Sequence, residues 1–393
     1  MITKEKAATT RVWFEYTLDG EGGLNYGESE KITYSKVDSS GREKKEDKTI
    51  KRLKKNTYRH GGQLVSVPKV SSNCIRHGLF QRVENFILRE GESMTSDSKD
   101  KLFWARFGTL SGLMRGYMNA AQGETYKRFS AVVASSATGE VHIDQEGNTL
   151  VPEISEEFFS SSSRKEATNG AASIFNAETV GRVRYFGDIH IDLVTLQFFP
   201  ISPGAERSCV PLGKSGDKNG YEEIVAQMKN SINTALKRYL TQPNEETANH
   251  GIVRFRGSVL PAEVGEFGVL LTDKGVSAAV WGFLKDCLLP FQIFRGGRAR
   301  ANLDSMKIYV EDANFDRQEF MVITKGLLSK DALNKFKDRL FQAKFDNYDL
   351  VAQGQDITEY FKSIERNKEE AGGEDRKKAP SANGKDKTKK RQR

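Results

Sequence analysis

The pattern of apolar and polar positions divides the chain into predicted strands and helices. Residues 10–18, TRVWFEYTL, alternate apolar and polar side chains and are rich in β-forming residues, which predicts a first strand. Residues 71–91 begin with serines and carry apolar side chains at helical spacing, which predicts a capped amphipathic helix. Residues 219–240 repeat that helical spacing. Because strands and helices interleave without a regular βα period, the pattern favours an α+β fold over a doubly wound sheet.

Four segments depart from this pattern. We expect one folded domain over residues 1–365, with three insertions, followed by a tail. Residues 37–62 are highly charged and almost without apolar side chains, which predicts an exposed basic loop. Residues 91–128 predict a helical insert, and residues 155–179 form a polar, serine-rich insert within β structure. Residues 366–393 combine many lysines with few apolar side chains, which predicts a disordered basic tail.

The charge of the chain is unevenly distributed. The net charge is +8 over 393 residues, which are enough for a sizeable core. Arg42–His60 holds nine basic and three acidic residues, and Arg366–Arg393 holds eleven and five, so the remainder is net acidic. Clustered positive charge favours a polyanionic partner, although such a tail can also serve only to keep a chain soluble.

Cysteine usage and hydropathy predict a cytoplasmic protein. Cys74, Cys209 and Cys287 lie far apart and form no CxxC pair, as expected in a reducing compartment. The longest apolar run, VSAAVWGFL, is far short of the ~20 residues that span a bilayer. Residues 1–11 lack the apolar core of a signal peptide. We therefore expect no membrane partner, and no metal or other cofactor.

Motifs of known catalytic chemistry are scarce. The GKS of Gly213–Ser215 lacks the glycine that a phosphate loop needs five residues earlier, where Ser208 stands. Asp188, His190 and Asp192 share one face of a predicted strand. They form either a metal site or the polar face of a strand whose other face is core. No further ligand cluster accompanies them, so we favour the polar face.

Basic side chains near glycines form the larger set of candidates. The N–H groups of a helix start capped by Ser71–Asn73 can bind a phosphate. Phe158, Phe159 and Phe175 bracket the serine-rich insert and offer rings for base stacking. The series predicts a nucleic-acid-binding protein. Its basic members are Arg76, Arg82, Arg106, Arg115, Arg164, Lys165, Arg295, Arg298 and Arg300.

Three segments follow one another along the chain: VPKVSSNCIRHGLFQR, SSSSRKEATNGAASIFNAETVGRVRYFGDIHID and FRGGRARANLDSMKIYV. In this order they resemble the Cas7 family (RAMP superfamily) of class 1 CRISPR effector backbone subunits, and type IV members most of all. The resemblance covers about residues 10–345 and implies a ferredoxin-like (RRM-like) palm with inserted helical fingers and a β-hairpin thumb. It also implies binding of a guide RNA (crRNA) and a head-to-tail filament of copies of the chain. Further implied partners are a Cas5-like cap, a large subunit and a DNA or RNA target.

The resemblance also implies roles by position. The start of the first helix would contact the guide backbone, residues 155–179 would form the thumb, and the glycine-rich loop at 295–300 would lie against phosphates. Ile174 and Phe175 would wedge beside a displaced base. Together with the basic candidates, the predicted RNA-binding residues are Ser71, Ser72, Asn73, Arg76, Arg82, Arg115, Arg164, Lys165, Ile174, Phe175, Arg295, Gly296, Gly297, Arg298 and Arg300.

The acidic residues predict binding without cleavage. Type III relatives cleave target RNA with an aspartate in the loop before the first helix. In this chain no Asp or Glu occurs between Asp47 and Glu84, so a carboxylate for a metal is missing there. We expect no catalytic residue. Two alternatives stay open: a metal-dependent ribonuclease using Asp38, Asp47 or the Asp188 face, and a single-strand nucleic-acid binder that works without a guide.

Overall fold

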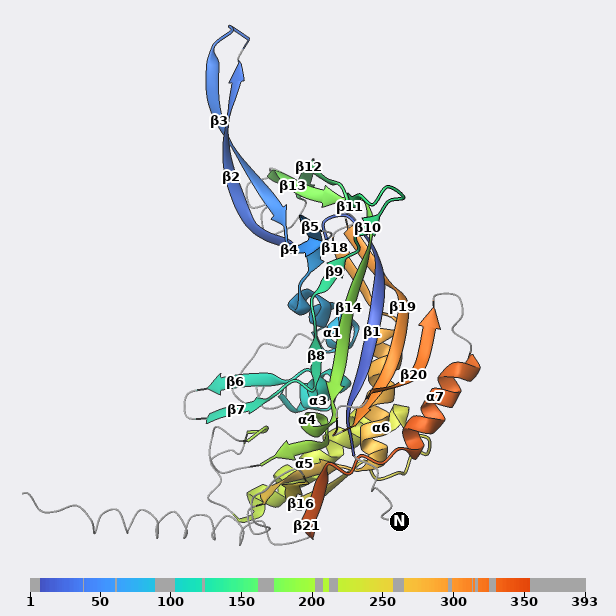
Figure 1. Cartoon of the computed structure of the whole chain (residues 1–393). Helices are drawn as coiled ribbons and strands as arrows, with labels where there is room; N and C mark the ends of the chain where they lie inside the picture. Colours follow the sequence, from blue (N-terminus) through green and yellow to red (C-terminus); the bar gives the residue numbers. More distant parts are fainter. Residues whose placement is uncertain are drawn as a thin grey trace, which may run out of the picture.

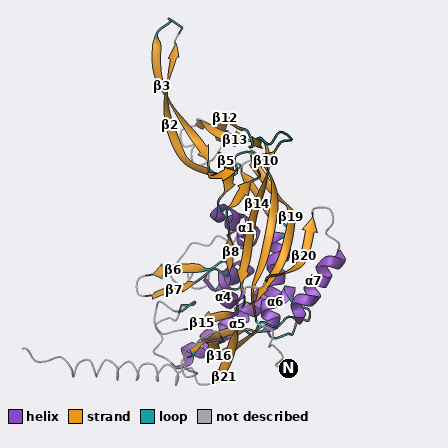
Figure 2. Cartoon of the chain, in the orientation of Figure 1, coloured by secondary structure: helices purple, strands orange, loops and turns teal. Residues whose placement is uncertain are grey.

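The computed structural model shows an elongated molecule, in which a long central sheet joins a helix-rich body to a projecting hairpin (Figure 1). Figure 2 shows that strands dominate and that the larger helices gather on one side of the central sheet and at its lower end. The structure confirms a mixed fold of helices and strands arranged in several sheets. The residues that it describes are 8–37, 39–60, 62–88, 103–121, 124–161, 173–201, 208–211, 218–256, 265–295, 299–312, 314, 317–324 and 330–353.

The central sheet is built around the first predicted strand. β1 (Thr9–Glu21) pairs antiparallel with β14 (Arg182–Asp192) on one side and with β19 (Ala299–Asp312) on the other. The path of the sheet is β18-β19-β1-β14-β9-β5-β4, with β20 beside β19 and β8 beside β14. The remaining bounds are β18 (Gln292–Arg295), β9 (Ala137–Gly139), β5 (Gln63–Val70), β4 (Lys55–His60), β8 (Val132–Ala134) and β20 (Arg317–Thr324).

The two faces of this sheet differ because β1 alternates in side-chain type. Val12, Phe14 and Leu18 are fully buried, whereas Trp13 and Glu15 point to the opposite, partly exposed face. Helices cover the buried face: α1 (Ser72–Leu88), α3 (Leu110–Met114), α6 (Asp273–Gly282) and its π-helical continuation η3 (Phe283–Leu288). In Figure 1 these helices lie behind β14, β1 and β19. The other face is called here the open face.

A second sheet closes the lower end of the body. Its order is β15-β17-β16-β21, and α5 packs against it with the apolar stripe expected from the sequence. Arg128 lies fully buried beside it and donates hydrogen bonds to the carbonyls of Leu113, Thr195, Leu196 and Phe198. The bounds are α4 (Leu193–Gln197), β15 (Phe198–Pro200), α5 (Lys218–Leu236), η2 (Lys237–Tyr239), β16 (Ala248–Phe255), β17 (Glu266–Leu271), α7 (Lys330–Gln342) and β21 (Tyr348–Gln353).

A third sheet, called here the projecting sheet, corrects the prediction of a basic loop at residues 37–62. Its order is β12-β13-β3-β2. β2 (Tyr26–Val37) and β3 (Glu43–Leu53) form the long hairpin that extends from the body in Figure 1, and β4 begins two residues later. The segment is exposed, as predicted, but it is not a loop. The segment has few apolar side chains to bury. Cross-strand hydrogen bonds and ion pairs stabilise it instead.

The insert at residues 91–128 is only partly helical. Residues 103–107 and α3 are helical within the described part, but Tyr117–Ala121 and Glu124–Arg128 pair as the antiparallel hairpin β6–β7. The prediction of a helical insert was therefore wrong for its second half. Gly116 separates the two halves with a φ of +75°, and a Cβ there would lie 2.5 Å from the Ser130 nitrogen. Only glycine fits that turn without strain. A small hairpin, β10 (His142–Ile143) and β11 (Thr149–Leu150), follows further on.

Candidate nucleic-acid interface

The start of α1 brings four predicted residues together. β5 ends at Val70, α1 begins at Ser72, and the Ile75 N–H donates to the Ser71 carbonyl over 3.0 Å. Asn73 is exposed and both serines are half-buried. No acidic residue lies in the first turn of the helix, so its N–H groups keep their partial positive charge toward solvent. This terminus has the electrostatics of a phosphate-binding helix start.

Two predicted arginines meet beside this helix start. The Arg76 Nη2 donates to the backbone oxygen of Arg115 over 2.9 Å, although the two residues are 39 positions apart. The Arg76 Nε is buried and has no hydrogen-bond partner. Burial, and then the positive charge of Arg76, lower the pKa of Arg115. The two positive charges interact and Arg76 has an unused donor, so an anion bound beside them would stabilise the pair.

The turn after α3 positions Arg115. Thr109 caps α3 by accepting a hydrogen bond from the Gly112 N–H, and the Arg115 N–H donates to the Ser111 carbonyl. The turn at Gly116, with its positive φ, then reverses the chain into β6. Local cap and turn chemistry therefore places the Arg115 backbone oxygen within reach of α1.

The glycine-rich segment at residues 294–303 is a β-hairpin rather than a loop. Phe294 pairs with Arg300 and Arg295 with Ala299. Gly296, Gly297 and Arg298 lie outside the described residues, and only the backbone of Arg295 is described. Arg300 is exposed and forms an ion pair with Glu21 at 3.1 Å. Such exposed pairs are weak, so this guanidinium remains able to exchange its partner for a phosphate.

α1 and this hairpin are neighbours. A Cβ on Gly78 of α1 would lie 2.9 Å from the Phe291 ring and 3.4 Å from the Gln292 carbonyl at the base of β18. Only a residue without a side chain permits this close packing. Figure 1 shows β18, β4 and β5 at the same end of the central sheet as β12 and β13. Parts of the three segments, namely β5, β12–β13 and β18, therefore lie at the same end of the central sheet.

The predicted thumb contains a hairpin. β12 (Ile154–Ser161) pairs antiparallel with β13 (Ser173–Val180), and the register places Phe159 opposite Phe175 and Ser160 opposite Ile174. The structure describes the backbone of these four residues but not their side chains. Arg164 and Lys165 lie outside the described residues, and Arg82 lies on α1 without a described side chain.

The sequence did not point to Glu178, which ties this hairpin to β3. Its carboxylate accepts from the Leu53 N–H at 2.7 Å, the Arg52 Nη1 at 2.9 Å and the Lys55 Nζ at 3.1 Å. Burial raises its pKa, but the Leu53 N–H and the Lys55 and Arg52 charges outweigh that effect, and the pKa is lowered. A single glutamate in a serine-rich region gives no signal of this role. The role follows from the parallel pairing of β13 with β3.

The acidic residues considered for catalysis are dispersed. Asp47 lies on β3, where it pairs with Lys31 at 2.6 Å and accepts a hydrogen bond from Thr33. Asp192 caps α4 by accepting from the backbone and hydroxyl of Thr195. Asp188 and His190 lie on the open face, as the polar-face interpretation predicted. In the part of the chain that the structure describes, no three His, Cys, Asp or Glu side chains are grouped to hold a metal ion. Asp38 lies outside that part.

Hydropathy along the helices gives one further finding. Among the described residues, no helix is both long and apolar enough to cross a membrane.

The chain is similar to known CRISPR-associated proteins in sequence and in structure. Residues 28–326 match the family model of the type I-Fv CRISPR-associated protein Cas7fv-like. A chain of the solved "Type IV-B CRISPR Complex" is 11% identical, with a TM-score of 0.24, over 65% of this chain and 90% of that chain. A chain of a solved "CRISPR RNA-guided surveillance complex" is 11% identical, with a TM-score of 0.22, over 85% of this chain and 84% of that chain. No curated protein matches.

Proposed function

Since the chain belongs to the Cas7fv-like family of type I-Fv CRISPR-associated proteins, we propose that it is a guide-RNA-binding backbone subunit of a CRISPR ribonucleoprotein. Membership confirms the Cas7 resemblance found in the sequence. In this function the chain oligomerises head to tail along a crRNA and presents it for pairing with a target nucleic acid. Its partners are the crRNA, further copies of itself, a Cas5-like cap, a large subunit, and a DNA or RNA target.

The observation that carries the proposal is the arginine pair at the start of α1. Arg76 and Arg115 hold two positive charges beside helix N–H groups that no acidic residue neutralises. A phosphodiester would add a negative charge and acceptor oxygens beside these two arginines. Such contacts bind the backbone of a strand and do not read its sequence. A subunit that must accept guides of any sequence requires contacts of this kind.

The strand order supports the ferredoxin-like palm. Along the chain, β1, α1, β8, β14, α6 and β19 form a β-α-β-β-α-β succession, and in the sheet β19, β1, β14 and β8 are successive neighbours. The other elements are then insertions into this unit. The hairpin β12–β13 corresponds to the proposed thumb, and the segment that contains α3 and β6–β7 corresponds to the fingers.

Binding without cleavage is part of the proposal. It is supported by Asp47, whose carboxylate is engaged by Lys31 and Thr33, and by Asp192, which caps a helix. Burial also disfavours the charged form of His190 and lowers its pKa, and the Arg11 charge lowers it further. The alternative of a ribonuclease needs these groups to be released from their present partners.

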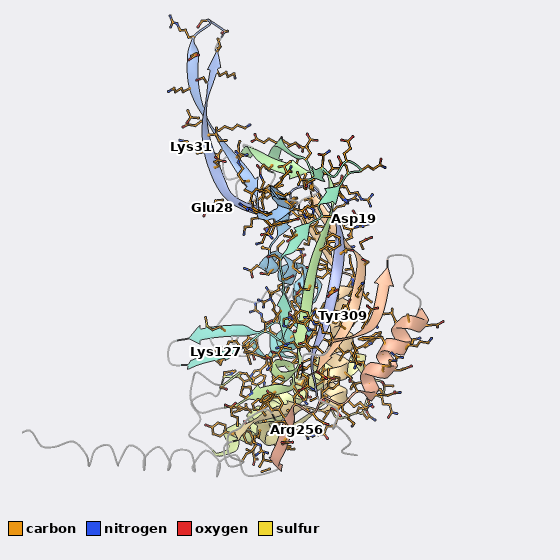
Figure 3. The ribbon with its side chains drawn as sticks, in the orientation of Figure 1. Asp19, Glu28, Lys31, Lys127, Arg256 and Tyr309 are labelled. Carbon is orange, nitrogen blue, oxygen red and sulfur yellow. The ribbon has the colours of Figure 1, made fainter. Side chains whose placement is uncertain are left out.

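The test is to purify the full chain from a CRISPR-containing host and sequence the nucleic acid that accompanies it. We expect small RNAs of defined length, and binding that weakens steeply with salt. The double variant Arg76→Ala, Arg115→Ala should lose most of that RNA. Arg256→Ala is the matched control, because Arg256 is an exposed arginine with aspartate partners at the opposite end of the body (Figure 3). Equal RNA recovery from the double variant and the control would contradict the proposal.

Cleavage is tested on the assembled complex with complementary RNA and Mg²⁺. We expect the target to remain intact. Regularly spaced products that disappear in Asp47→Ala or Asp188→Ala would establish the ribonuclease instead. Binding without preference for any RNA species would favour a single-strand binder that works without a guide.

A further inference from the structure

The hairpin β6–β7 carries an exposed apolar patch. Phe129, directly after β7, is 75% exposed, and Met118 on β6 is 73% exposed. Met118 is the cross-strand partner of Lys127, and the Lys127 ammonium lies 6.0 Å from the Phe129 ring centre. These three side chains, Met118, Lys127 and Phe129, are called here the Phe129 patch. Figure 3 shows Lys127 on this hairpin.

Arg128 fixes the direction of the Phe129 patch. Its guanidinium is enclosed in the body, where it donates to four backbone carbonyls and lies 3.6 Å from the Phe199 ring centre. Because successive side chains of a strand point to opposite faces, Lys127 and Phe129 point away from the body. The fold therefore holds the Phe129 ring in solvent, although an apolar ring is stabilised by burial.

The Phe129 patch adjoins the arginine pair at the start of α1. A Cβ on Gly116 would lie 2.7 Å from the Phe129 carbonyl carbon, so the two backbones are in contact. Arg115 directly precedes Gly116, and its carbonyl oxygen accepts the hydrogen bond from Arg76. The contacts that bring the two arginines together therefore also bring the backbone of Phe129 to the same site.

The charged groups around the patch are mostly positive. The arginine pair and Lys127 are cationic, and no acidic residue lies in the first turn of α1. Residues 115–129 contain one acidic residue, Glu124, which pairs with Ala121 at the far end of the hairpin. A ligand that fits this site is anionic and has an apolar surface. A nucleic-acid strand combines both properties, because its phosphates are negative and its bases have flat faces that stack.

The chemistry of Phe129 suits a base of any identity. Its ring has no hydrogen-bond donor or acceptor, and every base has a π face that stacks on an aromatic ring. The Lys127 ammonium beside the ring adds a positive charge for an adjoining phosphate. A contact of this kind holds a base without reading the sequence.

We propose that Phe129 stacks on one unpaired base of the nucleic-acid strand whose phosphates bind Arg76 and Arg115, with Met118 and Lys127 at the edge of that base. The inference rests on the proposed function, because it assumes that a strand is bound at the arginine pair. It adds a base contact to a site described so far by phosphate contacts alone. The stacked base fixes the position of the strand along the chain.

The experiment compares two single strands of equal length, a short oligoadenylate and an abasic strand that keeps the phosphates but lacks the bases. The full chain, freed of nucleic acid at high salt, is titrated with each strand by fluorescence anisotropy. We expect the oligoadenylate to bind about tenfold more tightly than the abasic strand. Phe129→Ala should remove this difference, and Phe129→Trp should retain it. Phe255→Ala is the matched control, since Phe255 is an exposed phenylalanine at the end of β16, and it should change nothing.

Salt dependence separates stacking from phosphate binding. For single strands, log K falls with log salt by about 0.7 for each phosphate that is neutralised. The double variant Arg76→Ala, Arg115→Ala should therefore reduce this slope by up to about 1.4. Phe129→Ala should leave the slope unchanged and weaken oligoadenylate binding by a similar factor at every salt concentration.

The outcomes distinguish this inference from the proposed function. Equal binding of the two strands by the unaltered chain, or a preference that persists in Phe129→Ala, overturns the stacking proposal and leaves phosphate binding in place. An unchanged salt slope in the double variant contradicts the proposed function instead. If Phe129→Ala binds both strands like the unaltered chain but loses self-association in sedimentation, the patch is a contact between copies and the stacking proposal is wrong.

Discussion

The central sheet and the projecting sheet are held together by different forces. Helices cover one face of the central sheet at β1, β14 and β19. The central sheet is therefore stabilised by the packing of buried apolar side chains. The projecting sheet carries charges along both of its long strands, and its Lys and Glu side chains pair across strands around the buried Glu178. A charged segment can therefore be ordered when its ion-pair partners lie far away in the sequence.

The largest effect is expected from Arg128, which stabilises the body. Arg128→Met keeps most of the side-chain length but removes four hydrogen bonds to backbone carbonyls. We expect a loss of roughly 3 kcal/mol or more in the free energy of unfolding, because four buried hydrogen bonds would be lost. Thermal unfolding followed by tryptophan fluorescence measures this loss.

Lys127→Met is the matched control for this substitution. Lys127 is the neighbouring cation on β7, and its ammonium lies 6.0 Å from the Phe129 ring at a partly exposed position (Figure 3). It should change the stability by less than about 1 kcal/mol. Equal losses in the two variants would show that the four hydrogen bonds contribute little.

A smaller and local effect is expected in the projecting sheet. Glu178→Gln removes the charge that joins Arg52, Lys55 and Leu53, and should cost about 1–2 kcal/mol in this sheet alone. Amide exchange in β3 and β13 should speed up, while tryptophan fluorescence should report an unchanged body. Glu156→Gln is the control, because Glu156 is more exposed and should have a weaker effect. Global unfolding would mean that the two sheets are not independent.

Acid should produce the same local loosening. The pKa of Glu178 is lower than its ordinary value of 4.5 in the folded state, so its contribution is fully present above that value. The contribution is lost as the pH falls through the folded pKa. Amide exchange in β3, corrected for its intrinsic pH dependence, should accelerate below about pH 4.5, the range in which a glutamate titrates. In Glu178→Gln this step should disappear, and its persistence would point to another carboxylate.

The smallest effect is expected on the helix-covered face of the central sheet, where the Tyr16 side chain is buried with those of Phe14 and Leu18. Tyr16→Phe removes a buried hydroxyl that has no partner, so the free energy of unfolding should stay the same or rise by about 1 kcal/mol. Denaturant unfolding of the nucleic-acid-free chain measures it. A clear loss of stability would show that the hydroxyl forms a hydrogen bond in solution.

The sequence predicted the elements whose apolar side chains follow a single period. The alternation in residues 10–18 predicted β1, and helical spacing predicted α1 and α5. It predicted a loop where β3 lies, since this strand is highly charged and its stability comes from partners such as Glu178. The helical reading of residues 117–128 was wrong because a glycine turn with positive φ ends the helix there.

The candidate site residues could also be predicted singly, but the contacts between them could not. Arg76 and Arg115 were predicted singly from their surroundings, but their contact bridges 39 positions and follows from the packing of α3 on α1. The pattern around Asp188 was noticed as a possible metal ligand set. Its place on the open face, opposite Glu15, depends on the strand register, which a local motif does not reveal.

The position of β1 has a consequence for synthesis on the ribosome. β1 is made about 300 residues before one of its two neighbours, β19, as the contact between Arg11 and Glu311 illustrates. The middle of the sheet therefore waits for most of the chain to be translated. Contacts of such long sequence separation slow folding, so nascent chains should spend seconds with an unpaired strand that chaperones can recognise.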